Sequence, residues 1–413
     1  MGSKKRFVLV DHSIIDSGGH HLEYAIRILT AAKQLGYSTD LWVNKKATNI
    51  NIAGVDRVAN VFTSTCWQIQ KSQGKLNLIR NYFMGRGKLY GAHRDIEEFS
   101  NEFERALVDN NLSDHDLIFI PTLGMGELIA VAKTLARKKL TGKNVHIVLR
   151  RDYFQNNSLF DVKRIVQNKI VHDGLSDLTR FECAHNFKFY TDTVVLNERY
   201  NAIGRFHFET LPIPIDDQLP SQRINCDQIL TVSYLGDARD EKGYYFLPDL
   251  IEAVQYKYQN DRLIKFLIQS NLAQGGNVKS IAALTRLKSL RDSNVKLMYG
   301  PFGSHEYADL ILRSNIIVIP YDASQYEARS SGILAEAMAV GIPCVYPDGT
   351  WMSKVAKGHN GVAYGENCSL QEALFKLIDN YNQYKTEAME FSAPWRDYNS
   401  STRVVKMLSQ AEN

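Results

Sequence analysis

The sequence predicts an α/β fold with two Rossmann-like domains, each a doubly wound parallel sheet, facing a central cleft. Short apolar runs typical of buried strands alternate along the chain with segments whose apolar residues recur at helical spacing. A proline-rich stretch at 211–220 interrupts this alternation, which then restarts and divides the chain of 413 residues into two halves. Parallel sheets of this kind bind ligands at the carboxyl ends of their strands.

In the first half, the expected strands alternate with helices as a doubly wound sheet requires. These strands are 7–10, 41–43, 117–120, 145–149, 187–190 and 194–196. The first helix carries apolar residues at Leu22, Ile26 and Leu29, and it should end near Gly36, because glycine is a common helix stop.

The second half follows a linker that contains Pro212, Pro214 and Pro220, which stiffen the chain and stop any helix. Its expected strands are 229–235, 266–268, 296–298, 316–320 and 344–346. The sequence therefore predicts three parts. They are an N-terminal domain at 1–212, a C-terminal domain at 213–391, and a separate helical piece at 392–413.

The composition, with 44% hydrophobic and 23% charged residues, is that of a globular protein. A net charge of +4 is too mild to suggest a nucleic-acid partner. The five cysteines are scattered without a C-x-x-C pair, so we expect reduced thiols of a cytosolic protein, without a disulfide framework or a zinc site. No apolar stretch is long enough for a signal peptide or a membrane span, which favours a cytoplasmic protein, bound at most to the inner face of a membrane.

The most informative segment is 326–343, which reads YEARSSGILAEAMAVGIP between two expected strands. Ser330, Ser331 and Gly332 stand at the start of a short helix, and Glu336 lies one turn further in. The free N–H groups and the positive dipole of a helix start suit a phosphate. A carboxylate further along can accept two hydrogen bonds from a ribose diol. The segment therefore predicts a site for a nucleotide diphosphate.

A second segment, YLGDARDEKG at 234–243, opens the second half. A strand runs into Gly236, and Arg239 and Lys242 stand three residues apart where the next helix should begin. Cations placed there could clamp the two phosphates of a leaving nucleotide and stabilise the charge that develops as the bond breaks. The alternative is that both are surface charges balanced by the acidic residues Asp237, Asp240 and Glu241.

The pairing of a G-x-x-R-x-x-K-G segment with a downstream E-A-M-A-x-G-x-P segment resembles the retaining glycosyltransferases of the GT-B fold, specifically the large family 4. The resemblance covers most of the second half, and the first half only through its Gly-Gly loop and strand pattern. It implies that Arg239 and Lys242 bind the donor diphosphate and that Glu336 binds the ribose hydroxyls. The amides expected to hold phosphate are those near Ser331, Gly332 and Ile333.

The resemblance further implies a nucleotide-diphosphate sugar as donor, a glycan or lipid-linked acceptor, and a front-face mechanism without a metal ion or other cofactor. It implies that the C-terminal tail crosses back to the first domain. One position departs from the family pattern. The family places a sugar-binding glutamate eight residues before the ribose-binding one, which here is Ala328, whereas Glu327 is one residue out of register. Either Glu327 takes that catalytic role through a loop adjustment, or the sugar is bound differently, for instance by Arg329.

In the first half, Gly18, Gly19, His20 and His21 lie between a strand and a helix. Glycines let a backbone approach a ligand closely, so this loop is a candidate for lining the cleft, with the glycines on the donor and the histidines on the acceptor. A simple tight turn and capping or surface histidines would give the same pattern. The charged run Arg150, Arg151 and Asp152 follows a buried strand, which indicates either an acceptor-binding rim or the surface end of that strand. The loop 122–127, at the end of another expected strand, is a further acceptor candidate.

Residues 66–94 hold six lysines and arginines and no acid, interleaved with aromatic and aliphatic side chains. This stretch is either a surface for an anionic membrane or an amphipathic helix on the core. Asp114-His115-Asp116 resembles a D-x-D metal motif but precedes a strand, so a loop or capping role is favoured.

Two rival classes remain. A dinucleotide-dependent oxidoreductase should show G-x-G-x-x-G after the first strand, whereas this loop reads DSGGHH. A non-catalytic sugar-nucleotide-binding subunit would bind nucleotide without turnover. Within enzymes, a sugar-nucleotide epimerase or phosphorylase on the same fold is a further alternative.

Overall fold

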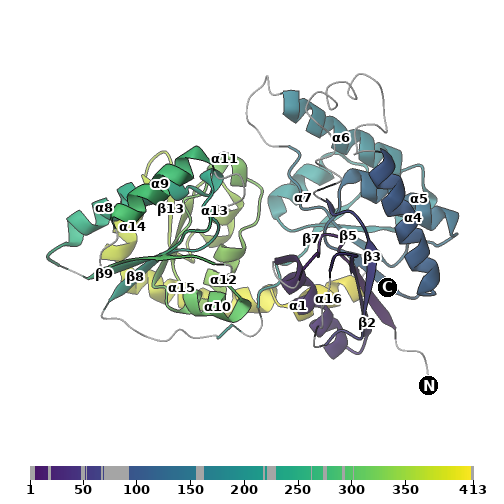
Figure 1. Ribbon diagram of the computed structural model, residues 1–413, viewed down its shortest axis with the longest axis horizontal. Helices are drawn as coiled ribbons and strands as arrows, with labels where there is room; N and C mark the ends of the chain where they lie inside the picture. Colours follow the sequence, from purple (N-terminus) through teal and green to yellow (C-terminus); the bar gives the residue numbers. More distant parts are fainter. Residues whose placement is uncertain are drawn as a thin grey trace. The chain divides into compact units, whose positions relative to one another are not determined.

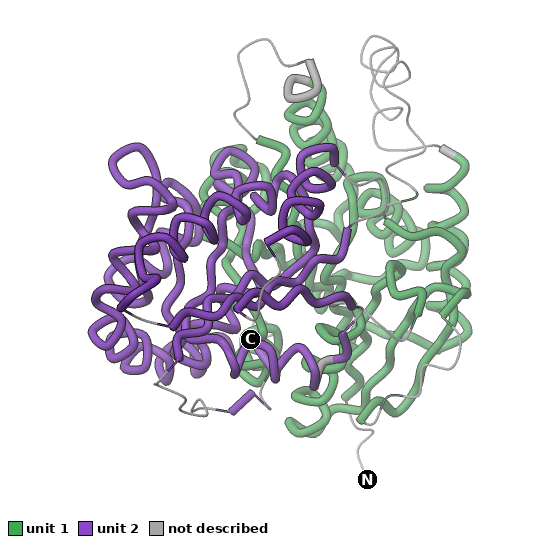
Figure 2. Tube along the Cα trace, turned by 60° about the vertical axis from the view of Figure 1, so that its left-hand side comes forward, with its two compact units in different colours: residues 1–214, 400–413 green, residues 215–399 purple. Residues whose placement is uncertain are grey.

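The computed structural model describes residues 5–16, 20–47, 52, 54–66, 68, 93–154, 162–216, 219–220, 229–261, 263–272, 277–290, 294–300 and 302–410. The chain forms two compact units (Figure 2). Unit 1 comprises residues 1–214 together with 400–413, and unit 2 comprises residues 215–399.

Unit 1 is built on a seven-stranded sheet in the order β3-β2-β1-β4-β5-β6-β7, and every strand pair in it is parallel. The strands are β1 (Arg6–Val10), β2 (Ser38–Asn44), β3 (Arg57–Phe62), β4 (Leu117–Ile120), β5 (Val145–Val148), β6 (Lys188–Thr191) and β7 (Phe208–Thr210). The helices are α1 (His20–Gln34), α4 (His93–Asp109), α5 (Met125–Arg137), α6 (Val162–Leu178), the 3-10 helix η1 (Glu182–Asn186), α7 (Val194–Asn201) and α16 (Ser401–Gln410).

The sheet of unit 1 is covered on both faces, because alternate residues of its strands point to opposite sides. Phe7 and Leu9 of β1 join a core with α1 and with Val404 of α16. On the other face, the ring of Trp42 in β2 packs edge-on against Phe103 of α4, with centroids 6.1 Å apart. Helices α4, α5 and α6 pack side by side on that second face (Figure 1).

Unit 2 is built on a six-stranded parallel sheet in the order β10-β9-β8-β11-β12-β13. The strands are β8 (Leu230–Tyr234), β9 (Ile264–Gln269), β10 (Val295–Met298), β11 (Ile316–Val318), β12 (Cys344–Pro347) and β13 (Val362–Tyr364). The helices are η2 (Asp240–Lys242), η3 (Tyr244–Phe246), α8 (Leu247–Tyr258), α9 (Val278–Ser289), α10 (Ser304–Leu312), α11 (Ala323–Tyr326), α12 (Gly332–Val340), α13 (Trp351–Ala356), α14 (Leu370–Asp379) and α15 (Tyr381–Tyr398). The apolar faces of α8, α9 and α14 form one core with the central strands, and α12 packs against α10 and α15.

The prediction of two doubly wound parallel sheets is confirmed, because both sheets are parallel throughout and strands alternate with helices. The prediction of a strand at 194–196 is wrong. These residues open α7, because the side chain of Thr193 caps the helix by accepting a hydrogen bond from the amide of Leu196. The last strand of unit 1 is instead β7.

The C-terminal segment differs from the single helical piece expected at 392–413. Residues 392–398 belong to α15 of unit 2, which runs through Pro394 to Tyr398. The chain then enters unit 1, where Val404 and Leu408 of α16 are fully buried against α1. The break falls at Asn399, whose side-chain amide donates to the carbonyl of Trp395 at 3.0 Å and so closes the end of α15.

None of the helices in the described part of the chain is both long enough and apolar enough to cross a membrane. Most of the basic segment expected to contact a membrane, residues 67 and 69–92, lies outside the described residues.

Candidate functional site

In each unit, two strands that are distant in sequence lie side by side at the centre of the sheet. They are β1 and β4 in unit 1, and β8 and β11 in unit 2. The loops that leave such a pair run in opposite directions, and the space above the carboxyl ends of the pair is where sheets of this class bind ligands. The first predicted donor segment follows β8 directly, and the second follows β11 after the short helix α11.

The loop after β8 is held tightly against the end of β11. The amide of Gly236 donates to Oε1 of Gln269 at 2.7 Å, and Arg239 precedes the short helix η2. Gly243 ends this helix in the left-handed region with φ +64°, and a Cβ there would lie 1.7 Å from the carbonyl oxygen of Pro320. Only glycine fits this contact, which fixes the position of Lys242.

Lys242 and Arg239 differ in their electrostatic surroundings. The guanidinium of Arg239 pairs with Asp237 at 2.7 Å and with Glu241 at 3.7 Å. The ammonium of Lys242 instead lies 5.7 Å from the ring centroid of Tyr321, and no carboxylate among the described residues pairs with it. The charge of Arg239 is therefore partly balanced by acidic neighbours, as the surface-charge alternative expects. The charge of Lys242 is not balanced by any carboxylate among the described residues.

The segment after β11 brings two tyrosines to this loop. The rings of Tyr321 and Tyr326 lie 4.4 Å apart. Burial raises the pKa of Tyr326 to about 12, and the nearby cations Lys242 and Arg329 oppose that rise. Burial also raises the pKa of Tyr321, whose hydroxyl contacts the side chain of Ser331. Lys242, Arg329 and Ser331 therefore surround the same pair of rings.

The start of α12 is open. Ser331 caps the helix by accepting a hydrogen bond from the amide of Leu334 at 3.4 Å. Gly332, the first helical residue, is exposed, and a Cβ built on it would meet no atom within 4 Å. The rest of the helix is apolar and buried, including Ile333, except for the half-buried Glu336. The first helical residue thus borders open space, while the rest of the helix is fixed in the core.

One backbone hydrogen bond and the burial of its neighbours define the surroundings of Glu327, the glutamate that is out of register. Glu327 is half-buried beyond the end of α11, and its carbonyl accepts a hydrogen bond from the amide of Trp351 at 2.8 Å. Ala328 is completely buried. The position at which family 4 carries its sugar-binding glutamate thus corresponds here to the buried methyl group of Ala328. Ser330 is half-buried between this turn and the helix start.

The acceptor candidates of unit 1 lie at the carboxyl ends of its strands. His21 contacts Asp11, which follows β1, with Nδ1 and Oδ2 2.8 Å apart. The guanidinium of Arg150 lies over the ring of Tyr24 at 4.3 Å, and that of Arg151 over Tyr153 at 5.0 Å. His20 is the first residue of α1, and Gly18 and Gly19 lie outside the described residues.

Asp152 has a different environment from its two arginine neighbours. Its carboxylate pairs with Arg199 of α7 at 2.8 Å and accepts from the amide of Phe154 at 2.9 Å, and its side chain is 1% exposed. This carboxylate therefore ties α7 to the loop after β5. The D-x-D-like segment has the loop role that was one of the two expected, because Asp114 accepts from the amide of Thr141 and Asp116 from that of Ser113.

Sequence reasoning did not find one group of unit 1, formed by His12, Cys66 and Glu127. These residues come from three separate segments that follow β1, β3 and β4, and no short spacing in the sequence connects them. Glu127 lies in the loop segment expected to bind acceptor, but it is completely buried.

Comparison with known proteins places the fold. Sucrose-phosphate synthase from Thermosynechococcus elongatus has a TM-score of 0.64 and 13% identity, with 98% of each chain covered. Anabaena HepE in complex with UDP and glucose has a TM-score of 0.61 and 13% identity, again with 98% of each chain covered. This is the GT-B fold. A putative UDP-N-acetylglucosamine 2-epimerase from Listeria monocytogenes matches with a TM-score of 0.54 and 10% identity, over 98% of this chain and 95% of that chain.

At the level of sequence there is no comparable likeness. No protein-family model matches the chain, and no curated protein matches it.

Proposed function

We propose that this protein is a retaining glycosyltransferase, similar to glycosyltransferase family 4, that moves a sugar from a nucleotide-diphosphate donor to a glycan or lipid-linked acceptor. The observation that carries the proposal is the position of Lys242. Its ammonium group has no carboxylate partner among the described residues, and it shares a tyrosine pair with the capped, open start of α12. A cation next to free helix amides is suited to a diphosphate.

The proposed donor site lies in unit 2. Lys242 and Arg239 bind the diphosphate, and Glu336 binds the ribose hydroxyls. The backbone groups and hydroxyls around the phosphates are those of Gly236, Ser330, Ser331, Gly332 and Ile333. Glu327, or Arg329 in its place, contacts the donor sugar.

In the proposed reaction, the bond between the anomeric carbon and the leaving phosphate oxygen breaks while the acceptor hydroxyl attacks the same face. The proton of that hydroxyl passes to the leaving oxygen. Lys242 and Arg239 stabilise the negative charge that develops on the diphosphate, which is the task that a divalent ion performs in other transferases. Transfer is therefore proposed to need no metal ion at the diphosphate.

The acceptor is proposed to bind to unit 1, near His20, His21, Arg150 and Arg151, with Asp152 holding the arginine-bearing loop in place through Arg199. Gly18 and Gly19 are proposed to approach the donor. The basic segment 66–94 is proposed to hold the protein peripherally at an anionic membrane surface, at the cytoplasmic face, where a lipid-linked acceptor is found.

The first test is nucleotide binding by calorimetry, with UDP, GDP, ADP and UDP-glucose and without added metal. UDP and UDP-glucose come first because the HepE structures hold UDP, glucose and UDP-glucose. Glu336→Ala should weaken binding by about tenfold or more, since a charge-assisted hydrogen bond contributes roughly 1.5–3 kcal/mol. Lys242→Ala should reduce turnover more than affinity. The control is Lys257→Ala, which removes a half-exposed ion pair with Asp379 elsewhere in unit 2. Equal nucleotide affinity in the wild type and all three variants would overturn the site.

Two other functions predict different results when the release of UDP is measured. The Listeria neighbour favours a sugar-nucleotide epimerase, which would change the configuration of the sugar without any acceptor. A non-catalytic binding subunit, suggested by Ala328 at the family's glutamate position, would bind the nucleotide but release no UDP in the presence of any acceptor. Release of UDP that depends on an acceptor distinguishes the transferase from both.

A further inference from the structure

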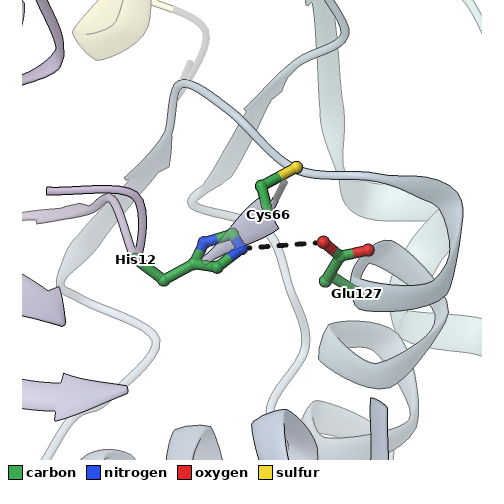
Figure 3. Close-up of side chains that lie close together, drawn as sticks. All are labelled: His12, Cys66 and Glu127. Carbon is green, nitrogen blue, oxygen red and sulfur yellow. Dashed lines mark ion pairs between the residues drawn. The ribbon is translucent and has the colours of Figure 1, made fainter. Parts of the chain in front are cut away.

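Three side chains with metal-binding atoms meet in the interior of unit 1 (Figure 3). His12 follows β1, Cys66 comes after β3, and Glu127 lies in the first turn of α5, after β4. Because the strands are parallel, these loops emerge at the same edge of the sheet. His12 and Glu127 are 0% exposed and Cys66 is 2% exposed.

The geometry of the group is close to that of a metal centre without its ion. The nitrogen, sulfur and oxygen ligand atoms all lie within 4.8 Å of one another. Nε2 of His12 lies 3.6 Å from Oε1 of Glu127, which is too long for a hydrogen bond. Two zinc bonds of about 2.1 Å span such a separation at an angle of about 120°, near the tetrahedral value.

The imidazole and the carboxylate lack other partners. Within the described part of the chain, neither ring nitrogen of His12 has a hydrogen bond, and the carboxylate of Glu127 has none outside the group, where it contacts the thiol of Cys66. The ring of His12 is held between Phe62 and Phe99, at centroid distances of 5.8 and 5.2 Å. Leaving such groups buried and unsatisfied costs free energy, so their retention points to a ligand between them.

We propose that His12, Cys66 and Glu127 bind a zinc ion, with the fourth coordination position left for water or another ligand. A thiolate and a carboxylate together balance the two positive charges of the ion, which suits a buried site. Thiolate with imidazole favours zinc over magnesium or calcium. Burial and the adjacent Glu127 raise the pKa of the Cys66 thiol. Zinc binds the thiolate form of cysteine, so its binding releases the thiol proton to solvent.

Among the described residues, Asp11 and Arg151 interact electrostatically with Cys66, and Tyr153 interacts with both Cys66 and Glu127. The centre belongs to unit 1, whereas the proposed diphosphate-binding residues belong to unit 2. The zinc proposal uses none of the residues proposed to bind the diphosphate, so it does not change the proposal that glycosyl transfer needs no metal there.

The test begins with tag-free, full-length protein that is loaded with zinc, dialysed and analysed for bound metal. The wild type should hold about one zinc ion per chain, and Cys66→Ser, His12→Gln and Glu127→Gln should each reduce the retained zinc by roughly tenfold or more. The matched control is Cys183→Ser, which changes another buried cysteine of unit 1 outside the group, and it should retain zinc. A wild type that retains no zinc, or retention that is equal in all variants, would overturn the proposal.

A second measurement does not depend on the folding of the variants. Titration of the wild type with cobalt(II) should produce a thiolate-to-cobalt charge-transfer band in the near ultraviolet, together with the intense visible bands of a tetrahedral site. Without the thiolate band the proposed centre is wrong. Affinity for UDP, read in parallel, should be the same with and without zinc, so failure of the zinc site and failure of the donor site are separate outcomes.

Discussion

Replacing Gly243 with alanine should destabilise unit 2 much more than the same change at Gly349. Both glycines are in the left-handed region, with φ of +64° and +70°. They differ in their surroundings, because a Cβ at Gly243 would lie 1.7 Å from the carbonyl oxygen of Pro320, whereas a Cβ at Gly349 would meet no atom within 4 Å. The pair therefore separates backbone strain from a steric clash.

The magnitude follows from these two contributions. The left-handed conformation costs a residue with a Cβ about 1–2 kcal/mol, and this cost is common to both variants. Only Gly243→Ala must also push the carbonyl of Pro320 away by more than an ångström, to reach the 3.0 Å below which real Cβ contacts are essentially absent. Changes that combine strain with overpacking reach about 3–5 kcal/mol.

Urea and thermal unfolding of the full chain measure the difference. A loss of 1 kcal/mol lowers the Tm of a unit of this size by about 2–4 °C, so Gly349→Ala should melt about 2–8 °C below the wild type. Gly243→Ala should melt roughly 6–20 °C lower, by the same relation. Its nucleotide affinity should also fall, because Lys242 precedes the changed residue. Equal destabilisation by the two substitutions would refute this reasoning.

Two other predictions concern single residues. Burial lowers the pKa of His146 to about 3, and the nearby Lys188 and Lys5 contribute to this. The unfolded chain therefore binds a proton below about pH 6.5 that the folded chain does not. The contribution of His146 to stability is therefore fully present above about pH 6.5. The free energy of unfolding should fall by roughly 2 kcal/mol between pH 7 and pH 5 because of this residue. Denaturation at both pH values should show a smaller fall in His146→Gln, and an unchanged fall would contradict the assignment. Gly332→Ala should raise stability by up to about 1 kcal/mol, since its Cβ meets no atom, yet weaken UDP binding because the methyl group occupies the space proposed for phosphate. Calorimetry that shows unchanged affinity would place the phosphate elsewhere.

The fold and the position of the donor candidates could be predicted because their signals are local. A strand that runs into Gly236, and the serine that caps a short apolar helix before Glu336, are each contained in a few consecutive residues. Local chemistry also explains one error. Val194 and Val195 are residues that favour strands, but the N-cap formed by Thr193 stabilises a helix at this position.

The group of His12, Cys66 and Glu127 could not be predicted in this way. Its members are brought together by the order of the strands rather than by spacing, and a search for close cysteine and histidine pairs finds nothing in the sequence. The partners of Arg239 illustrate the same limit. The sequence offered three acids, and only the structure shows that Asp237 and Glu241 bind it while Asp240 accepts from the amide of Ser280.

The return of α16 to unit 1 has a consequence for biosynthesis. Val404, Val405 and Leu408 complete the core over α1, yet they are translated only after the whole of unit 2. Unit 2 is one continuous segment and can fold as soon as it leaves the ribosome, whereas the apolar face of α1 must wait uncovered. Unit 2 should therefore complete its fold before unit 1, although most of unit 1 is synthesised first. Chaperones should be needed most while the core of the nascent unit 1 is still incomplete.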